Sequence, residues 1–326
     1  MYSIESLQEL VNNAITKNVI SIKLKPSGLY KPIQYIMNSG GKRLRPVLVL
    51  MGCDLFGGDV NQVIMPAIGF EMFHNFTLLH DDIMDNAPIR RNKPTVHVKW
   101  NTNTAILSGD AMSIWAYKFI AQAPESSLKP ILDLFSNTAI KICEGQQYDM
   151  EFEVKDKVSV ADYLEMIELK TSVLIAACLK AGAIIAGASA TDTDLIDKFG
   201  LNIGLAFQLQ DDWLDVYGNT ADFGKTIGGD IVANKKTFLL VSALQMADNK
   251  DKKELQKWVQ MEKPNPEEKI KAITDIYNRL AIDKLLQNKK NEYLSAAVLA
   301  LDKISVDIGC KHILRTLAEK LMVRTI

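Results

Sequence analysis

Residues 195–216 read LIDKFGLNIGLAFQLQDDWLDV, an apolar stretch that ends in the acidic pattern Asp-Asp-x-x-Asp at Asp211–Asp215. The same pattern occurs a second time at Asp81–Asp85, after the apolar stretch 66–79. Helices with so little polar surface cannot lie on water, so other helices have to surround them. Residues 163–188 have the same character. The sequence therefore predicts an all-α bundle whose acidic helix ends meet across a central cavity, where bundles usually hold metals and ligands.

The predicted fold is a single domain over residues 1–326, with about a dozen helices. Strand signals are nearly absent, and neither Asn-Gly nor Asp-Gly marks a hairpin turn. No linker or low-complexity tract divides the chain, and no internal repeat occurs beyond the two acidic patterns. Pro46 is predicted to be the first residue of its helix. The predicted helices cover residues 3–19, 30–38, 46–56, 61–85, 102–123, 127–152, 160–187, 192–217, 235–247, 251–260, 266–283, 284–306 and 309–323.

Composition narrows the class of protein. A formal net charge of −1 argues against a nucleic-acid partner, and 48% hydrophobic residues fit a globular protein with a large core. Residues 1–20 carry Glu5 and Glu9 and no continuous apolar core, so we expect no signal peptide and a cytoplasmic location. Residues 172–190 could mimic a membrane span, but Lys180 interrupts them, so a buried core helix is expected and no membrane span.

The four cysteines are far apart and show no Cys-x-x-Cys spacing, so they suggest neither a zinc site nor a disulfide framework. They are predicted to be reduced core residues. They are Cys53, Cys143, Cys178 and Cys310.

The aspartates themselves indicate a cation. On a helix, residues four apart share a face, so Asp81 lies beside Asp85 and Asp211 beside Asp215 as like-charge pairs. Helix C-terminal ends also disfavour negative charge. Carboxylates without histidine or thiolate neighbours suit a hard metal such as Mg²⁺, which uses one or two carboxylates per ion together with water and substrate phosphate.

Basic residues accompany the acidic patterns in four places. Three cations precede the helix that begins near Pro46, where an anion would be favoured; the alternative is a solvated charged turn. Arg90-Arg91 could form a surface salt bridge, or could grip a diphosphate. Lys170 lies inside an apolar helix, where burying its charge without a hydrogen-bonding or ionic partner would cost free energy of folding. The remaining cations follow the second acidic pattern and are Lys225, Lys235 and Lys236.

With these motifs in this order, the chain resembles the trans-prenyl diphosphate synthases, the polyprenyl synthetase family. The resemblance covers most of the chain. The matching motifs are GGKRLRP at 40–46, LLHDDIMD at 78–85 with Arg90-Arg91, GQQYD at 145–149, Lys170-Thr171, FQLQDDWLD at 207–215 and GKTIGGD at 224–230.

The resemblance implies an isoprenoid synthase fold around an active-site cavity, a homodimer, and head-to-tail condensation of isopentenyl diphosphate with allylic diphosphates. It implies that Asp81, Asp85, Asp211 and Asp215 bind Mg²⁺, with Asp82 and Asp212 as further or supporting ligands. The catalytic groups would be these six aspartates with Arg90, Lys170 and Lys225. Isopentenyl diphosphate would be held by Lys42, Arg45, His74 and Arg91. The allylic diphosphate would be held by Arg90, Lys170, Thr171, Gln208, Lys225 and Lys235. Because Thr226 lengthens the interval after Lys225 relative to some relatives, Lys236 is an alternative to Lys235.

Product length is expected to depend on the helix that ends at Asp81. Phe76 matches the position at which an aromatic side chain keeps products short in the family, although helical geometry places Thr77 and Phe73 closer to the Asp81 face. The expected product is geranylgeranyl or farnesyl diphosphate. The alternatives are a synthase of longer polyprenyl chains, a terpene cyclase, a non-catalytic synthase subunit and a metal-dependent phosphohydrolase. A second aspartate-rich motif with a following lysine disfavours the cyclase and the subunit, and a hydrolase would be expected to have histidines among its metal ligands.

Overall fold

The structure, a computed structural model, describes residues 2–21, 25–218 and 227–323. Its longer helices are α1 (Ile4–Ile15), α2 (Ser27–Met37), α3 (Leu44–Leu55), α4 (Ile64–Met84), α6 (Thr102–Ile120), α7 (Glu125–Val154), α8 (Val160–Ile167), α9 (Val173–Ile185), α10 (Ala190–Tyr217), α13 (Phe238–Met246), α14 (Asn249–Gln260), α15 (Pro266–Arg279), α16 (Ile282–Lys303) and α17 (Ile308–Val323). The shorter elements are the π-helices η1 (Thr16–Ile20) and η3 (Glu168–Ser172), the 3-10 helix η2 (Val60–Val63), the single turns α5 (Val96–Lys99) and α12 (Gly229–Val232), and the strands β1 (Ile89–Arg90) and β2 (Lys93–Pro94).

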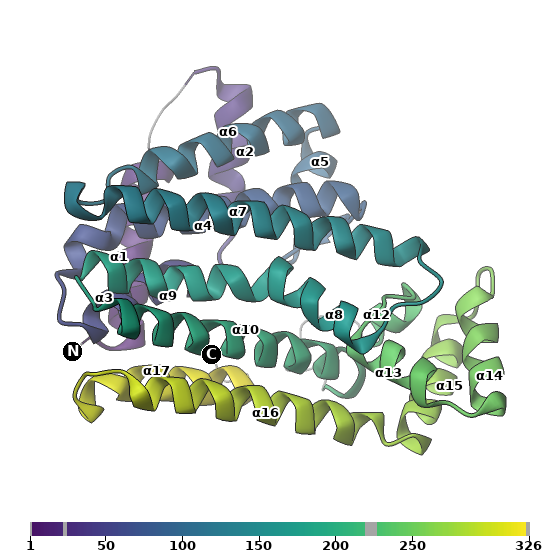
Figure 1. Cartoon of the computed structure of the whole chain (residues 1–326). Helices are drawn as coiled ribbons and strands as arrows, with labels where there is room; N and C mark the ends of the chain where they lie inside the picture. The colour runs from purple at the N-terminus through teal and green to yellow at the C-terminus, as the bar shows by residue number, and fades with distance from the viewer. Residues whose placement is uncertain (1, 22–24, 219–226, 324–326) are drawn as a thin grey trace.

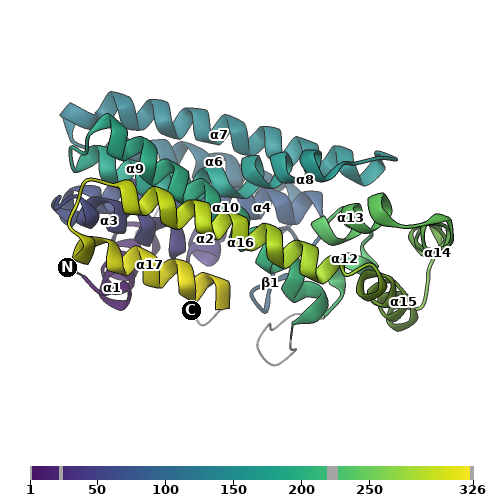
Figure 2. The same ribbon diagram turned by 60° about the horizontal axis from the view of Figure 1, so that its bottom comes forward.

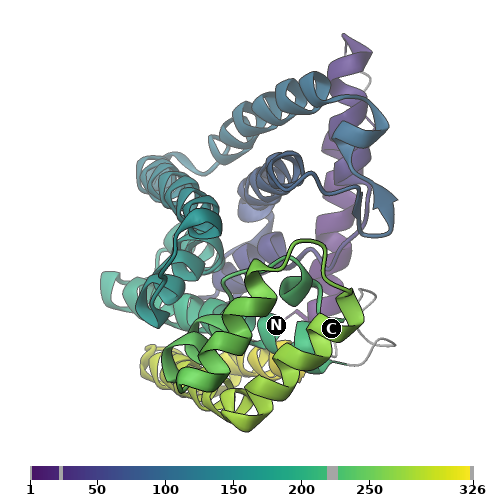
Figure 3. The ribbon, with the colours of Figure 1, turned by 90° about the vertical axis from the view of Figure 1, so that its right-hand side faces the viewer.

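The helices are stacked in layers, which confirms the predicted all-α bundle. In Figure 1, α6 lies above α4 and α7, followed by α9 with α10 and then by α16 with α17, while α2 runs steeply downward behind α6. The view along the helices in Figure 3 shows α4 enclosed by its neighbours, and α13 to α15 gather at one end of the bundle (Figure 2). This enclosure explains why α4 and α10 carry apolar residues nearly all round.

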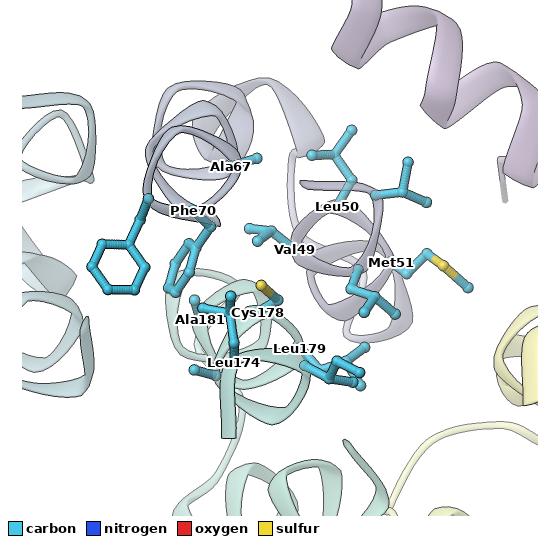
Figure 4. Close-up of a cluster of buried hydrophobic side chains, with 14 of the residues drawn as sticks. Val49, Leu50, Met51, Ala67, Phe70, Leu174, Cys178, Leu179 and Ala181 are labelled. Atoms are coloured by element: carbon cyan, nitrogen blue, oxygen red, sulfur yellow. The ribbon is translucent and has the colours of Figure 1, made fainter. Parts of the chain in front are cut away.

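The core is built where α3, α4 and α9 cross (Figure 4). Two glycines allow α3 and α9 to approach closely: a Cβ at Gly52 would lie 2.2 Å from the Leu179 carbonyl oxygen, and one at Gly182 would lie 2.1 Å from that of Val49. Any larger residue at either position would separate the two backbones. Since α3 also packs on α4, this close approach helps to determine where α9 lies relative to α4.

The bundle contains no candidate membrane span within the residues that the structure describes. Within the stretch 172–190, residues Val173–Ile185 form α9, most of which is buried, as predicted. Lys180 interrupts it near the surface, where its ammonium lies 3.4 Å from the carboxylate of Asp197.

The structure corrects several local predictions. Helix α3 begins at Leu44, so Pro46 is its third residue rather than its first. Proline is tolerated there because no N–H of the first turn has a partner within the helix. The predicted helix 160–187 is divided into α8, η3 and α9, because one π-helical turn interrupts it. Cys143 is exposed, although the other three cysteines are buried or partly buried and all four are free, as predicted.

A small hairpin is present that the sequence did not predict. Strands β1 and β2 pair antiparallel through the two-residue turn Arg91-Asn92, in which both residues have positive φ, 51° and 58°. Two consecutive positive φ values are typical of a type I′ turn, which Asn-Gly usually marks. Only Asn92 carries that signal here, so the pattern escaped notice.

Candidate active site

A cavity of about 570 Å³ opens between α4, α7, α9 and α10, at the ends of α4 and α10 that carry the acidic patterns. It brings together side chains from distant parts of the sequence. Its charged and polar lining comprises Arg45, His74, Thr77, His80, Asp81, Arg90, Arg91, Gln146, Gln147, Lys170, Thr171, Gln208 and Asp211. Its other lining residues are Phe76, Leu78, Met84, Ile142, Cys143, Met150, Leu174 and Phe207. The cavity thus combines a strongly charged region with an apolar wall.

The first acidic pattern is held by two cations. Arg90 donates from Nε to Asp82 at 2.6 Å and from Nη2 to Asp81 at 3.2 Å. Lys170 donates to the other oxygen of Asp81 at 3.2 Å. Asp82 is only 2% exposed, and burial raises the pKa of its carboxyl even though Arg90 opposes the shift. Asp81 therefore faces the cavity, whereas Asp82 lies beneath it as a partner of Arg90.

Lys170 reaches the cavity because the π-helix η3 and α7 meet at close range. A Cβ at Gly145 would lie 2.3 Å from the backbone nitrogen of Lys170, so only glycine allows this approach. One turn further along α7, Asp149 accepts from Lys170 at 2.6 Å. The motif at 145–149 by itself predicts no role for Asp149; its one relevant signal is the spacing of Gly145 and Asp149, four residues apart on one helix face.

Asp85 lies at the C-terminal end of α4, as predicted for the acidic patterns. Burial raises the pKa of its carboxyl, and the negative charge of Asp81 raises it further. Repulsion between these carboxylates is the penalty that a bound cation would relieve. Within the described residues, however, no three histidine, cysteine, aspartate or glutamate side chains converge into a ready-made metal cage. An ion with few protein ligands, such as Mg²⁺, fits this arrangement better than zinc does.

The second acidic pattern divides its aspartates between the cavity and the interior. Asp211 lines the cavity. Asp212 points the other way and accepts hydrogen bonds from the Tyr163 hydroxyl, from Gln208 at 3.3 Å and from the backbone N–H of Phe238 at 3.2 Å. Burial, followed by the charge of Asp230, raises the pKa of Asp212 to about 7. In this structure Asp212 is a buried link between α8, α10 and α13.

Asp215 anchors the segment that follows α10. Its carboxylate accepts from the backbone N–H of Asp230 at 3.0 Å, and it is 8% exposed. Lys225 lies outside the described residues. Lys235 keeps part of its side chain in contact with solvent, while its ammonium lies among several carboxylates. Desolvation by the surrounding protein would lower its pKa, but the charges of Asp230 and then Asp149 outweigh that effect and raise it. Lys236 instead donates to the backbone carbonyl of Lys155 at 3.5 Å. Of the two alternatives, Lys235 is therefore the one directed at the aspartates.

Arginines crowd around His74 on the opposite wall. Arg43 is buried and paired with Glu71 at 2.9 Å, which joins the segment before α3 to α4. Arg45 lines the cavity, and its Nε is a buried donor without a hydrogen-bond partner. An anion in the cavity would satisfy it. Burial, with the charges of Arg45 and Arg91 next in importance, keeps the pKa of His74 well below its usual value, so His74 is neutral at pH 7.

Arg91 lies across the loop that precedes α3. Its Nη1 donates to the carbonyl of Gly40 at 2.5 Å, and its guanidinium carbon lies 2.9 Å from where a Cβ of Gly41 would be. Gly41 also has φ of +119°, which favours glycine. The Gly-Gly pair thus makes room for Arg91 beside Lys42 and Arg45. Lys42 is not among the residues lining the cavity, and its backbone carbonyl accepts from Gln8 at 2.9 Å.

Thr171, Gln208 and the aromatic residues of α4 complete the site. Thr171 donates to Gln208 at 3.4 Å, which extends the hydrogen-bonded chain to Asp212. Phe76 and Thr77 line the cavity, whereas Phe73 is 4% exposed and lies behind them, with its ring centroid 5.4 Å from that of Phe76. Of the three residues singled out from the sequence, Phe76 and Thr77 therefore lie on the cavity wall and Phe73 does not.

Comparison with known proteins identifies the family of this chain. The family model described as Polyprenyl synthetase matches residues 26–277. The geranylgeranyl diphosphate synthase of Sulfolobus acidocaldarius is 37% identical over 303 residues, which cover 91% of each chain. That of Methanosarcina mazei is 40% identical over 223 residues, 68% of this chain and 69% of that one.

Solved structures agree as well. A crystal structure of a geranylgeranyl pyrophosphate synthase matches with a TM-score of 0.94 and 40% identity, covering 99% of both chains. The synthase of Corynebacterium glutamicum, complexed with isoprenyl diphosphate and magnesium, matches with a TM-score of 0.85 and 26% identity over 98% of both chains. Fold and cavity define an all-α isoprenoid synthase. The chain belongs to the polyprenyl synthetase family, and it is a prenyltransferase similar to geranylgeranyl diphosphate synthases.

Proposed function

We propose that this chain condenses isopentenyl diphosphate head-to-tail with allylic diphosphates in a magnesium-dependent reaction that ends at geranylgeranyl diphosphate. One observation carries the proposal. Asp81 and Asp211 come from different helices, yet they line one cavity that also has an apolar wall. A diphosphate and a hydrocarbon chain need such a combination, because one end of the substrate is highly charged and the other must be kept from water.

The acidic residues are suited to hold Mg²⁺. We assign it to Asp81, Asp85, Asp211 and Asp215, with Asp82 and Asp212 in supporting positions. When bound, the metal stabilises the negative charge that develops on the departing diphosphate. The crowding that raises the pKa of Asp85 supports this assignment, since a cation relieves it.

The cations of the cavity divide between two diphosphates. Arg90 and Lys170 already contact Asp81, so a diphosphate bound there would meet them together with Thr171, Gln208, Lys225 and Lys235. These residues would hold the allylic substrate and stabilise the leaving group. Arg45 and Arg91, with Lys42 and neutral His74, would hold isopentenyl diphosphate on the other side. The unpartnered Nε of Arg45 supports an anion there.

The apolar wall would protect the allylic carbocation from water and direct the growing chain. Phe76 stands on this wall with Leu174 and Phe207. A chain that extends along α4 from Asp81 therefore meets the Phe76 ring, beside which Thr77 leaves space. This arrangement supports a product of 20 carbons, as in the relatives named geranylgeranyl diphosphate synthase.

We also propose a homodimer, formed through α6 and α7. Their outward faces expose large apolar side chains that find no partner within the described chain. Leu107, Ile114 and Ile140 are 61%, 63% and 57% exposed. Light scattering at micromolar concentration should give about twice the monomer mass of 36.3 kDa. Fully active enzyme that remains monomeric would contradict this part of the proposal.

The decisive experiment is product analysis. The purified protein is incubated with Mg²⁺, isopentenyl diphosphate and either dimethylallyl, geranyl or farnesyl diphosphate, and the products are separated by chromatography. Geranylgeranyl diphosphate from all three primers is the expected outcome. Longer chains would identify a long-chain synthase, cyclic hydrocarbons a terpene cyclase, free alcohol and phosphate a hydrolase, and no product a subunit that needs a catalytic partner.

A further inference from the structure

A buried lysine outside the cavity holds the turn from which Lys235 extends. Lys269, on α15, is 1% exposed. Its ammonium donates to the backbone carbonyl of Val232 at 3.1 Å and to the side-chain oxygen of Asn234 at 2.6 Å. Within the described residues, no carboxylate lies at ion-pair distance from it. Both groups that accept hydrogen bonds from the Lys269 ammonium are therefore neutral, and both belong to the segment immediately before Lys235.

Burying the Lys269 ammonium in this way costs free energy of folding. A buried ammonium loses its hydration, and neutral acceptors repay only part of that loss. Burial accordingly lowers the pKa of Lys269. A methionine or leucine would fill a similar volume without this cost. What an apolar side chain could not do is donate to two acceptors at once.

The two acceptors define the shape of the turn. Val232 ends α12, where carbonyl groups lack partners within the helix. Asn234 has φ of +56°, in the left-handed region, and its amide nitrogen also donates to the carbonyl of Val259 at 3.0 Å. The side chain of Asn234 is thus held by α14 on one side and by Lys269 of α15 on the other. The next residue is Lys235.

The other end of the same segment is fastened to α10. The N–H of Asp230 donates to the Asp215 carboxylate at 3.0 Å, and the N–H of Gly228 donates to the Asp215 backbone carbonyl at 2.6 Å. The N–H of Lys235 donates to the carbonyl of Asp230 at 2.9 Å. Residues 228–235 are therefore a short bracket anchored at two points: Asp215 at its start and Lys269 at its end.

We propose that Lys269 is a positioning residue for Lys235: its two hydrogen bonds fix the bracket so that the Lys235 ammonium faces Asp81, Asp149 and Asp230. The inference rests on the proposed function, in which Lys235 holds the allylic diphosphate. Lys269 touches no reacting group itself. Its effect should reach the reaction only through Lys235.

The test replaces Lys269 by methionine, which keeps the length and removes the donors. The Lys269→Met variant should raise the KM for the allylic diphosphate about tenfold, which corresponds to the loss of one well-placed charged contact, and should change the KM for isopentenyl diphosphate less than about twofold. Lys271→Met is the matched control, because Lys271 is exposed on the same helix. It should match the wild type in both constants.

The double variant separates positioning from general damage. If Lys269 acts through Lys235, then Lys269→Met combined with Lys235→Met should be no worse for the allylic KM than Lys235→Met alone. Additive effects, or equal losses for both substrates, would overturn the proposal, as would a Lys269→Met variant with a lower Tm and wild-type constants. If Lys269→Met does not fold, Asn234→Gly serves in its place, because glycine tolerates the positive φ at this position and the substitution removes one acceptor of Lys269. It should likewise raise the KM for the allylic diphosphate more than the KM for isopentenyl diphosphate.

A binding measurement keeps this inference separate from the proposed function. Titration calorimetry with inorganic pyrophosphate and Mg²⁺ needs no turnover. Lys269→Met should weaken this binding by the same factor as it raises the allylic KM, and Lys271→Met should not. An absence of prenyl products from the wild type would refute the proposed function, whereas unchanged pyrophosphate affinity in Lys269→Met would refute the role of Lys269.

Discussion

Arg90 binds both members of the first aspartate pair, at 2.6 Å from Asp82 and 3.2 Å from Asp81. Its neighbour Arg91 contacts neither and instead donates to Gly40 near the start of α3. The two adjacent arginines thus face different halves of the cavity. They are separated by the positive φ of Arg91, which turns the chain at the tip of the hairpin.

This separation predicts different kinetic consequences. Arg91→Ala should raise the KM for isopentenyl diphosphate roughly tenfold or more, because a charge-assisted contact to phosphate is lost. Arg90→Ala should chiefly impair the allylic substrate. Steady-state kinetics with each substrate varied in turn will measure both constants. Equal effects of the two substitutions on the two substrates would mean that the arginines form one shared clamp.

The aspartates that line the cavity should be essential for turnover but not for folding. Asp81→Ala and Asp211→Ala should each lower kcat by roughly 10²-fold or more, as is typical for loss of a group that stabilises developing charge. The fold should persist, since removing one of several crowded carboxylates relieves repulsion. Chelation of divalent metal should abolish activity in the wild type, and added Mg²⁺ should restore it. Substantial activity of Asp211→Ala would exclude a second metal-binding cluster.

His74 should make the stability of the protein depend on pH. Its pKa in the folded state lies well below the value of about 6.5 expected in the unfolded chain, because of burial and then Arg45 and Arg91. Below pH 6.5 the unfolded state therefore binds a proton that the folded state excludes. The free energy of unfolding should fall by up to about 1.4 kcal/mol per pH unit between 6.5 and the folded pKa, and should be insensitive to this residue above 6.5.

His74→Gln should remove that contribution. Denaturant unfolding of both proteins at pH 5.5 and 7.5 measures it, and the difference between the two pH values should be smaller for the variant. If both proteins lose the same stability on acidification, His74 is not the group responsible.

Phe76 should limit the product length. Phe76→Ala opens the wall beside Thr77, so the product distribution should shift from 20 carbons towards longer chains, as judged by chromatography of the dephosphorylated products. Phe73→Ala is an informative comparison, because Phe73 lies behind Phe76 against Phe135 and should act only once Phe76 is removed. Unchanged products from Phe76→Ala would place the end of the chain elsewhere.

Much of this architecture can be predicted from the sequence, because its strongest signals are local. The apolar run before Asp211 and the one before Asp81 predict buried helices with acidic ends, and both are present. Cys143 and Asp212 show the limit of such reasoning: one is exposed on the cavity wall and the other turned into the interior, and nothing in their neighbours along the chain indicates either orientation. Such facts depend on which helix packs alongside, so they are properties of tertiary structure.

The same limit applies to Lys170. Its costly position inside an apolar helix indicated a partner, but the partner could not be named, since Asp149 lies on a different helix and reaches it only because Gly145 lets α7 approach. Nothing in the sequence around Lys269 indicates that its side chain is buried. A lysine in a polar helix is normally solvated, and only the packing of α15 on α12 buries it.

The π-helical turn at 168–172 has a consequence for how this site can change. A π turn holds one residue more than the surrounding α-helix, so it shifts the angular phase of everything before it relative to α9 by roughly 100°. Deleting a single residue there would leave composition and hydrophobicity almost unchanged, yet it would rotate Tyr163 and the rest of α8 out of register with α10, or carry Lys170 away from Asp81. A point substitution can weaken one contact, whereas a length change in this turn would displace a whole segment, and with it either the contact of Tyr163 with Asp212 or that of Lys170 with Asp81. Two proteins whose sequences differ in length by one residue at this turn should therefore have differently arranged active sites, even if their aspartate motifs are the same.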